Sequence, residues 1–238
     1  SGIGYIVRMS LRTWTKTEIP SVVEEVENAA RELETATPAE IITWAAERVG
    51  ESLTVTCSFE DAVLAHVAAT AVPGIEIVML DTQYLFAETM WFAEELQRRC
   101  DLNLRIIRPL TVTPDNRWQT DTEGCCAVRK VEPLNALLAT RTGWVTGVRR
   151  VDGPTRANTP VLSVDVQRNV VKVNPLALFT DEDVATYELI HELPRNPLSD
   201  RGYSSIGCWP CTRPTAPGED KRAGRWSGQA KTECGLHI

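Results

Sequence analysis

The stretch LTVTCSFEDAVLAHVAATAVPGIEIVML, residues 53–80, decides the fold of this chain. It predicts a buried strand over residues 53–57, a helix from about Asp61 to Ala71, and a second strand over residues 75–80. A crossover that contains a whole helix returns the chain to the same edge of the sheet. We therefore expect the two strands to pair in parallel, as in an α/β fold.

The same alternation continues on both sides of this stretch. Helical spacing of apolar residues predicts further helices, and short β-branched runs predict further strands. The predicted helices cover residues 22–33, 38–49, 85–100 and 131–138, with one more that Thr180 caps; the predicted strands cover 104–107, 144–148, 161–164 and 170–173. The fold class is therefore α/β, a Rossmann-like parallel sheet with helices on both faces.

The chain is predicted to have one folded domain and a tail. Residues 20–211 form the single α/β nucleotide-binding domain. From Arg213 onward no apolar period remains, and Pro, Gly and charged residues dominate. We therefore expect residues 212–238 to be a flexible C-terminal segment.

Composition excludes several classes of protein. The 238 residues are 43% hydrophobic and 24% charged, as in a soluble globular protein. A net charge of −7 argues against a nucleic-acid-binding protein. No apolar run approaches the roughly 20 residues of a membrane span, and no secretory signal is evident. We therefore expect a cytoplasmic protein with reduced thiols.

The seven cysteines fall into groups. Cys125 and Cys126 are adjacent, and Cys208 and Cys211 form a C-x-x-C about eighty residues later. Four thiols suit either an iron–sulfur cluster or a zinc site. The adjacent pair favours the cluster, because zinc motifs usually separate their cysteines by two to four residues. Zinc, and thiols that are unligated or disulfide-paired, remain alternatives. Cys57 and Cys100 lie in apolar segments and are expected to be ordinary buried residues.

Polar or glycine residues follow three of the predicted strands. In a parallel sheet, the carboxyl ends of the strands meet at one edge, where ligands bind. The candidates for ligand binding are Ser58, Phe59 and Asp61 after the first strand, Leu80, Asp81 and Thr82 at the second, and Gly147, Arg149 and Arg150 after the fourth. Each loop alone could be a plain turn, but together they predict a pocket of the size of adenosine.

Basic residues and one further cysteine complete the candidate site. Six cations lie in loops or beside the cysteine motifs of an otherwise acidic chain, namely Lys130, Arg149, Arg150, Arg156, Arg222 and Arg225. Arginine forks match phosphate and sulfate oxygens, so an anionic ligand is expected, although solvated surface charges are the alternative. Cys234 stands two residues before Leu236-His237, and a cysteine near a cation attacks as thiolate. An accidental cysteine in a disordered tail is the alternative.

The motifs together resemble a known family. They are Cys125-Cys126-x-x-Arg129-Lys130, Thr146-Gly147-x-Arg149-Arg150, Thr155-Arg156, Ile206-Gly207-Cys208-x-Pro210-Cys211-Thr212-Arg213-Pro214, Gly224-Arg225-Trp226 and Glu233-Cys234-Gly235-Leu236-His237. From about Leu53 to His237 the chain resembles the phosphoadenylyl-sulfate reductase family, in its assimilatory, iron–sulfur-containing, adenylyl-sulfate-reducing branch.

The resemblance implies a fold, a reaction and a cofactor. The sheet would be of the adenine nucleotide alpha hydrolase-like type. Cys125, Cys126, Cys208 and Cys211 would hold a 4Fe–4S cluster. Cys234 would be the catalytic nucleophile, attacking adenylyl sulfate bound among Lys130, Arg156, Arg222, Arg225 and His237. AMP and sulfite would be the products, with thioredoxin as the reductant, in sulfate assimilation and cysteine biosynthesis. A homo-oligomer is possible for such a chain.

Two loops depart from the family's pattern. Cys57-Ser58-Phe59-Glu60-Asp61 lacks the glycine that commonly precedes the acidic residue, and Gln83 stands where a glycine is common. Related ATP pyrophosphatases need glycines there so that the backbone can approach pyrophosphate, which argues against ATP cleavage. Three alternatives remain, namely a 3′-phosphoadenylyl-sulfate reductase, an AMP-forming ATP pyrophosphatase, and a non-catalytic metal-binding regulator.

Overall fold

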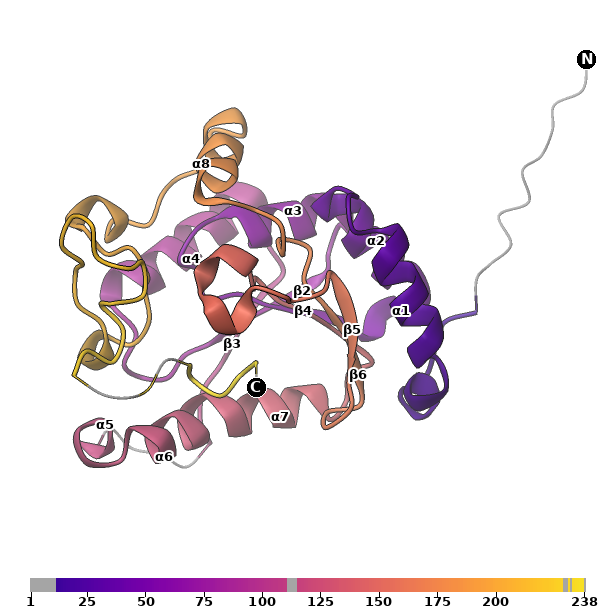
Figure 1. The fold of residues 1–238 in the computed structure, drawn as a ribbon, viewed down its shortest axis with the longest axis horizontal. Helices are drawn as coiled ribbons and strands as arrows, with labels where there is room; N and C mark the ends of the chain where they lie inside the picture. The colour runs from indigo at the N-terminus through magenta and orange to yellow at the C-terminus, as the bar shows by residue number, and fades with distance from the viewer. Residues whose placement is uncertain (1–11, 111–114, 229–230, 232, 238) are drawn as a thin grey trace, which may run out of the picture.

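A six-stranded sheet forms the centre of the protein (Figure 1). The computed structural model describes residues 12–110, 115–228, 231 and 233–237. The strands are β1 (Leu53–Thr56), β2 (Glu76–Leu80), β3 (Leu104–Ile107), β4 (Gly143–Val145), β5 (Leu162–Asp165) and β6 (Val170–Val173). Their order across the sheet is β3-β2-β1-β4-β6-β5. The predicted α/β architecture is confirmed.

One strand runs against the others. The pairs β1–β2, β1–β4, β2–β3 and β4–β6 are parallel, but β5 and β6 are antiparallel. Only residues 166–169 separate these two strands. Such a short link can form a hairpin, whereas a parallel pair needs a crossover of a dozen residues or more. The sheet is therefore mixed, with one antiparallel edge strand on an otherwise parallel sheet.

Helices cover both faces of the sheet. They are α1 (Val23–Glu32), α2 (Pro38–Val49), α3 (Val63–Ala71), α4 (Ala87–Cys100), α5 (Arg117–Thr120), α6 (Thr122–Cys126), α7 (Glu132–Leu138) and α8 (Asp181–Ile190). Figure 1 shows α1 to α4 on one side of the sheet and α5 to α7 in line on the other. None of the helices in the described part of the chain has the length and apolar character needed to cross a membrane.

Local sequence explains where two of these helices begin. Thr37 accepts a hydrogen bond from the amide of Glu40, whose carboxylate accepts one from the amide of Thr37, and Pro38 occupies the first turn. Thr180 and Asp183 form the same reciprocal arrangement at α8. Such capping boxes satisfy amides that a helix N-terminus leaves without partners. The predicted cap at Thr180 is therefore confirmed.

The core lies on both sides of the sheet. The larger apolar cluster fills the face covered by α1 to α4 and includes Val55 and Ile77, which are fully buried. A smaller cluster on the α7 side contains Leu134, Leu138, Trp144 and Val170. Leu236, near the end of the chain, packs against this smaller cluster. The C-terminal segment is thus part of the packing on the α7 face.

The helix that carries the first cysteine pair has an unusual turn. Residues 127–131 form one π-helical turn between α6 and α7, so a single helical rod runs from Thr122 to Leu138. Sequence periodicity predicted only its second half, residues 131–138. Single π turns inside α-helices are frequently found at functional sites. Here the wide turn carries Arg129 and Lys130.

Candidate active site

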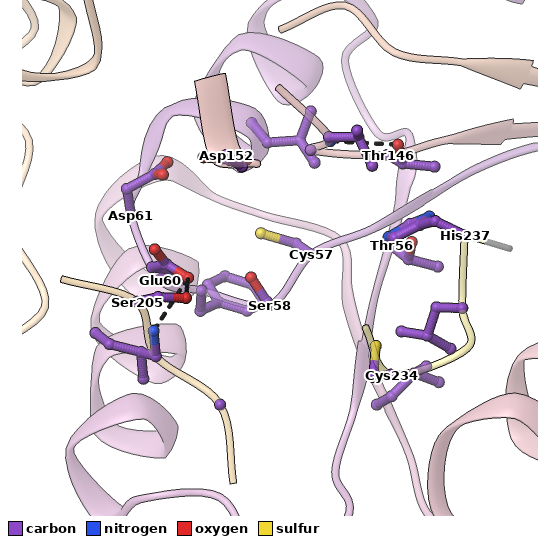
Figure 2. Close-up of a pocket in the computed structure, with 18 of the residues that line it drawn as sticks. Thr56, Cys57, Ser58, Glu60, Asp61, Thr146, Asp152, Ser205, Cys234 and His237 are labelled. Atoms are coloured by element: carbon purple, nitrogen blue, oxygen red, sulfur yellow. Dashed lines mark hydrogen bonds between the residues drawn. The ribbon is translucent and has the colours of Figure 1, made fainter. Parts of the chain in front are cut away.

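A pocket of about 200 Å³ opens at the carboxyl ends of β1, β2 and β4. It gathers thirteen of the residues predicted from sequence, from segments far apart along the chain. They are Ser58, Phe59, Asp61, Leu80, Thr82, Lys130, Gly147, Arg149, Arg156, Arg222, Arg225, Cys234 and His237. Figure 2 shows Cys234 and His237 on one side of the pocket and Glu60, Asp61 and Ser205 on the other.

Two residues that were predicted to contact the ligand, Arg150 and Asp81, do not line this pocket. The Arg150 side chain pairs with Glu34 at 2.7 Å and donates to the carbonyl of Thr159. Asp81 is also outside the lining. It accepts a hydrogen bond from Arg108 at 2.8 Å and caps the turn through the amide of Gln83. In this structure both side chains therefore support the loops that carry the pocket and do not line it.

The two loops without glycine keep a glycine-like backbone. Phe59 has a φ of 54° and Gln83 a φ of 67°, both in the left-handed region. Non-glycine residues enter that region at a cost of roughly 1–2 kcal/mol. The Phe59 ring is fully buried in the core, and the Gln83 amide oxygen accepts a 2.6 Å hydrogen bond from Arg129. These anchored side chains hold the strained conformations.

On the acidic side of the pocket, sequence reasoning predicted only Asp61 and missed Glu60 and Asp152. Glu60 accepts hydrogen bonds from the amide of Ile206 at 3.2 Å and from the Ser205 hydroxyl at 3.5 Å. Burial raises the pKa of Glu60 and that of Asp61. Asp152 also lines this pocket. The only available signal was that Glu60 and Asp61 follow a strand directly.

A charged network behind the pocket also escaped prediction. Arg149 donates to Asp152 and Asp181 at 2.8 Å each. Lys221 lines the pocket, ion-pairs with Asp181 and lies 3.5 Å from Asp152. This network ties the N-terminus of α8 to the loop that carries Arg222. In the sequence, Lys221 was distinguished only by its position beside Arg222.

The cationic side of the pocket is held by close packing. The Arg225 guanidinium lies over the Trp226 ring at 4.6 Å and donates to Ser205 and the carbonyl of Ile206. A Cβ atom at Gly207 would come within 2.2 Å of that guanidinium. Glycine at position 207 therefore leaves the space that the Arg225 guanidinium occupies.

Lys130 lies between the pocket and the cysteine groups. Burial disfavours its charged form, yet its pKa is raised overall, because negative charge on Cys208, Cys234 and Cys126 would stabilise the ammonium. Lys130 lines both the pocket and the adjoining cavity that the paired cysteines line. Its ammonium is therefore placed to act on anions in either of them.

The described end of the C-terminal segment is docked in the pocket. Glu233 pairs with Arg156 at 2.7 Å, and a Cβ atom at Gly235 would lie 3.4 Å from Val131. Burial lowers the pKa of His237 well below its usual value, with further contributions from Lys172 and Arg156. The charged form of His237 is therefore disfavoured at this position. The flexibility expected of residues 212–238 stays a prediction.

The four paired cysteines line one small cavity beside the pocket. Tyr84, Trp118, Arg129 and Lys130 also line it. All seven cysteines of the chain are free thiols, so the disulfide alternative is not found. The Thr82 hydroxyl lies 3.2 Å from the sulfur of Cys208. The C-x-x-C loop is attached to the sheet edge, because the amide of Trp209 donates to the carbonyl of Tyr84 at 2.8 Å.

The donor set of this cavity fits a metal cluster. Burial raises the pKa of Cys125, Cys126 and Cys211, that of Cys126 to about 11, so buried positive charge is needed for these sulfurs to become thiolates. Within the described ranges, no three ligating side chains converge to hold a single metal ion. Four cysteine sulfurs that line one cavity are the number of ligands that a 4Fe–4S cluster needs.

Known proteins similar to this chain agree with one another. The family described as "Phosphoadenosine phosphosulfate reductase domain" matches residues 52–214. An adenosine 5′-phosphosulfate reductase from Streptomyces coelicolor is 47% identical, covering 89% of this chain and 92% of the relative. A protein of the same name from Mycobacteroides abscessus is 42% identical, covering 96% and 99%.

Solved structures support the fold. A phosphoadenylyl-sulfate reductase from Candida auris superposes with a TM-score of 0.70 at 23% identity, covering 80% of this chain and 97% of that one. An FMN adenylyltransferase from Candida glabrata has a TM-score of 0.56 at 13% identity, covering 83% and 74%. Because the family match spans more than half of the chain and the relatives cover nearly all of it, this chain belongs to the adenosine 5′-phosphosulfate reductase family of sulfur-reducing enzymes.

Proposed function

We propose that this enzyme reduces adenylyl sulfate to sulfite and AMP through a sulfonated Cys234 that thioredoxin resolves. The observation that carries the proposal is the position of Cys234, which lines the same pocket as the loops after β1, β2 and β4 and the cations Lys130, Arg222 and Arg225. The loops that would bind the nucleotide, the cations that would bind its anionic group and the sulfur that would attack it therefore line one space. The names of the close relatives point to the same substrate.

In the proposed reaction, the Cys234 thiolate attacks the sulfur of adenylyl sulfate. A bond forms between the two sulfur atoms, and the bond from the sulfate sulfur to the phosphate oxygen breaks. That oxygen keeps the bonding electron pair, so AMP leaves as an anion. Guanidinium groups of Arg156, Arg222 and Arg225 would stabilise the charge that develops on the phosphate and sulfate oxygens.

Reduction is completed by two thiols. A thioredoxin thiolate attacks the Cys234 sulfur, which releases sulfite and forms a mixed disulfide. The second thioredoxin thiol then frees Cys234 as a thiolate and leaves oxidised thioredoxin. Sulfur falls from the sulfate to the sulfite oxidation state by two electrons, and two thiols supply them by becoming one disulfide. No other reductant is needed.

The paired cysteines have a separate role in this proposal. Cys125, Cys126, Cys208 and Cys211 would hold a 4Fe–4S cluster, which supplies charge next to the anion site. Lys130, which lines both the cluster cavity and the pocket, would orient the sulfate. Such groups behind a reacting centre set the orientation and charge of those that touch it. We also propose the cytoplasm as the compartment, since the mechanism needs reduced thiols.

Trapping the intermediate tests the proposal. Incubation with adenylyl sulfate and no thioredoxin should add one sulfonate to the C-terminal peptide containing Cys234, measured by mass spectrometry. Cys234→Ser should bind substrate and form neither adduct nor sulfite. Cys100→Ser, which alters a half-buried thiol on α4, is the matched control and should behave as the wild type. Retained turnover in Cys234→Ser, or an adduct on Cys57 or Cys100, would contradict the mechanism.

Two alternatives make different predictions in the same assays. An AMP-forming ATP pyrophosphatase would release pyrophosphate from ATP. The loops argue against it, because Phe59 and Gln83 retain side chains where close approach of backbone to pyrophosphate needs glycine. A non-catalytic metal-binding regulator would be unaffected by Cys234→Ser.

A further inference from the structure

The carboxylate of Glu233, immediately before Cys234, lies in an arginine fork. Arg156 donates from Nε to Oε1 at 2.8 Å and from Nη2 to Oε2 at 2.7 Å. Two parallel hydrogen bonds of this kind are the geometry with which arginine also binds phosphate and sulfate. An acidic side chain of the protein therefore makes the contacts that an oxyanion ligand would make.

Two further groups surround the same carboxylate. The Arg222 Nη2 atom lies 3.4 Å from Oε2, and the Thr155 hydroxyl donates to Oε1 at 3.2 Å. The side chains of Glu233, Arg156 and Arg222 are only 11%, 13% and 16% exposed. In a site this enclosed, one carboxylate excludes a second anion from the same donors.

Electrostatics show why an anion is needed there. Burial lowers the pKa of Arg222, and the neighbouring charges of Arg156 and Arg225 lower it further. Burial would raise the pKa of Glu233, but the hydrogen bonds and charge of Arg156 outweigh it and lower that pKa overall. The ionised Glu233 carboxylate, together with that of Glu60, thus offsets part of the repulsion that Arg222 experiences from Arg156 and Arg225.

We infer that Glu233 is an internal substitute for the phosphosulfate of the substrate, and that substrate binding displaces it from Arg156 and Arg222. This inference rests on the proposed function, since it assumes that the substrate anion uses these arginines. Because Glu233 and Cys234 are neighbours in the chain, displacement of the carboxylate also moves the nucleophile. Glu233 is therefore a positioning residue that couples arrival of the substrate to repositioning of Cys234.

Removing the internal anion should tighten binding of an external one. We would measure the Kd of ADP, whose terminal phosphate stands in for the sulfate, by calorimetry with the wild type and with Glu233→Gln. The variant should bind ADP about tenfold more tightly, within the usual range of coupling between sites. Adenosine, which carries no anion, should bind both proteins equally.

A matched variant controls for charge alone. Glu219 pairs with Arg213 in the same C-terminal part of the chain but does not line the pocket. Glu219→Gln should therefore leave the Kd of ADP unchanged.

The rate of Cys234 alkylation gives a second readout, because ADP should accelerate this reaction in the wild type. In Glu233→Gln it should be fast without ADP and insensitive to it. Glu233→Ala should shift both readouts in the same direction.

The two ways of failing are distinguishable. If the wild type binds ADP and forms the Cys234 adduct with adenylyl sulfate, but Glu233→Gln binds ADP no more tightly, this inference is wrong and the proposed function stands. If the wild type binds neither ADP nor adenylyl sulfate and forms no adduct, the proposed function is wrong and the inference falls with it.

Discussion

The imidazole of His237 lies parallel to the indole of Trp144, with ring centroids 5.4 Å apart and planes 12° apart. Trp144 is fully buried in β4, and its Nε1 donates to the Thr56 hydroxyl at 2.8 Å. The indole is thus a fixed platform for the penultimate residue of the chain. Together with the Glu233–Arg156 pair, this stacking fixes the segment on both sides of Cys234.

His237→Ala should loosen this docked segment. An aromatic pair contributes about 0.5–1.5 kcal/mol, so alkylation of Cys234 in the ligand-free enzyme should accelerate roughly 2- to 12-fold. The rate would be measured by mass spectrometry of the C-terminal peptide. His191→Ala removes a ring contact with Tyr187 outside the pocket and is the control. Equal rates in the His237 variant and the wild type would show that stacking does not hold the segment.

Replacing a paired cysteine should remove the metal and destabilise the fold. Cys126→Ser and Cys208→Ser each delete one proposed ligand from the cavity that lies between the α6–α7 rod and the C-x-x-C loop. We expect loss of iron and sulfide, loss of the visible absorption band under anaerobic conditions, and a lower Tm. Cys100→Ser should retain all three. Stoichiometric zinc without iron in the wild type would contradict the cluster assignment.

Substrate preference should follow the cysteine motif. The four paired cysteines are part of the resemblance to the adenylyl-sulfate-reducing branch, so we expect kcat/KM with adenylyl sulfate to far exceed that with its 3′-phosphorylated form. Both are measured by sulfite release with the same thioredoxin. Comparable values would show that the cysteine motif does not determine the preference.

At the amino end of β2, Glu76 makes a contribution to stability that depends on pH. Glu76 accepts hydrogen bonds from Arg105, Arg141 and Thr54. Burial would raise its pKa, but these partners lower it below the ordinary 4.5. The ionised form is therefore the stabilising one. Its contribution is present above about pH 4.5 and is lost as the pH falls through the lower folded-state pKa.

Glu76→Gln should accordingly lower the free energy of unfolding by about 1 kcal/mol at neutral pH. The difference from the wild type should shrink as the pH is lowered below about 4.5. Urea titrations at several pH values measure both effects. A difference that stayed constant down to pH 3 would indicate that the lost stability does not come from the charge of Glu76.

The sheet could be predicted from sequence because apolar residues are spaced differently in its strands and in the helices that connect them. The antiparallel direction of β5 was not predicted, because the residues of a short strand do not show which way it runs. The only sign of that direction is the four-residue link between β5 and β6. The π turn at Ala127–Val131 was hidden because two basic residues inside it, Arg129 and Lys130, interrupt the apolar spacing.

Most of the pocket could be predicted because the carboxyl ends of parallel strands meet at one edge. The exceptions show the limit of that rule. Arg150 and Arg149 are adjacent, and only tertiary packing decides that Arg149 lines the pocket whereas Arg150 pairs with Glu34. Phe59 and Gln83 also show that a left-handed turn can persist without glycine when packing and hydrogen bonds fix the side chain.

The separation of the two cysteine pairs has a consequence during protein synthesis. Cys126 and Cys208 are 82 positions apart in the chain. At roughly 5–20 residues per second, a ribosome needs roughly 4–16 s to add them. During that interval the first two thiols have left the peptidyl-transferase centre while their partners are still untranslated. The complete donor set of the proposed cluster would therefore exist only after Cys211 has been translated, and Cys234 follows all four of these cysteines in the chain.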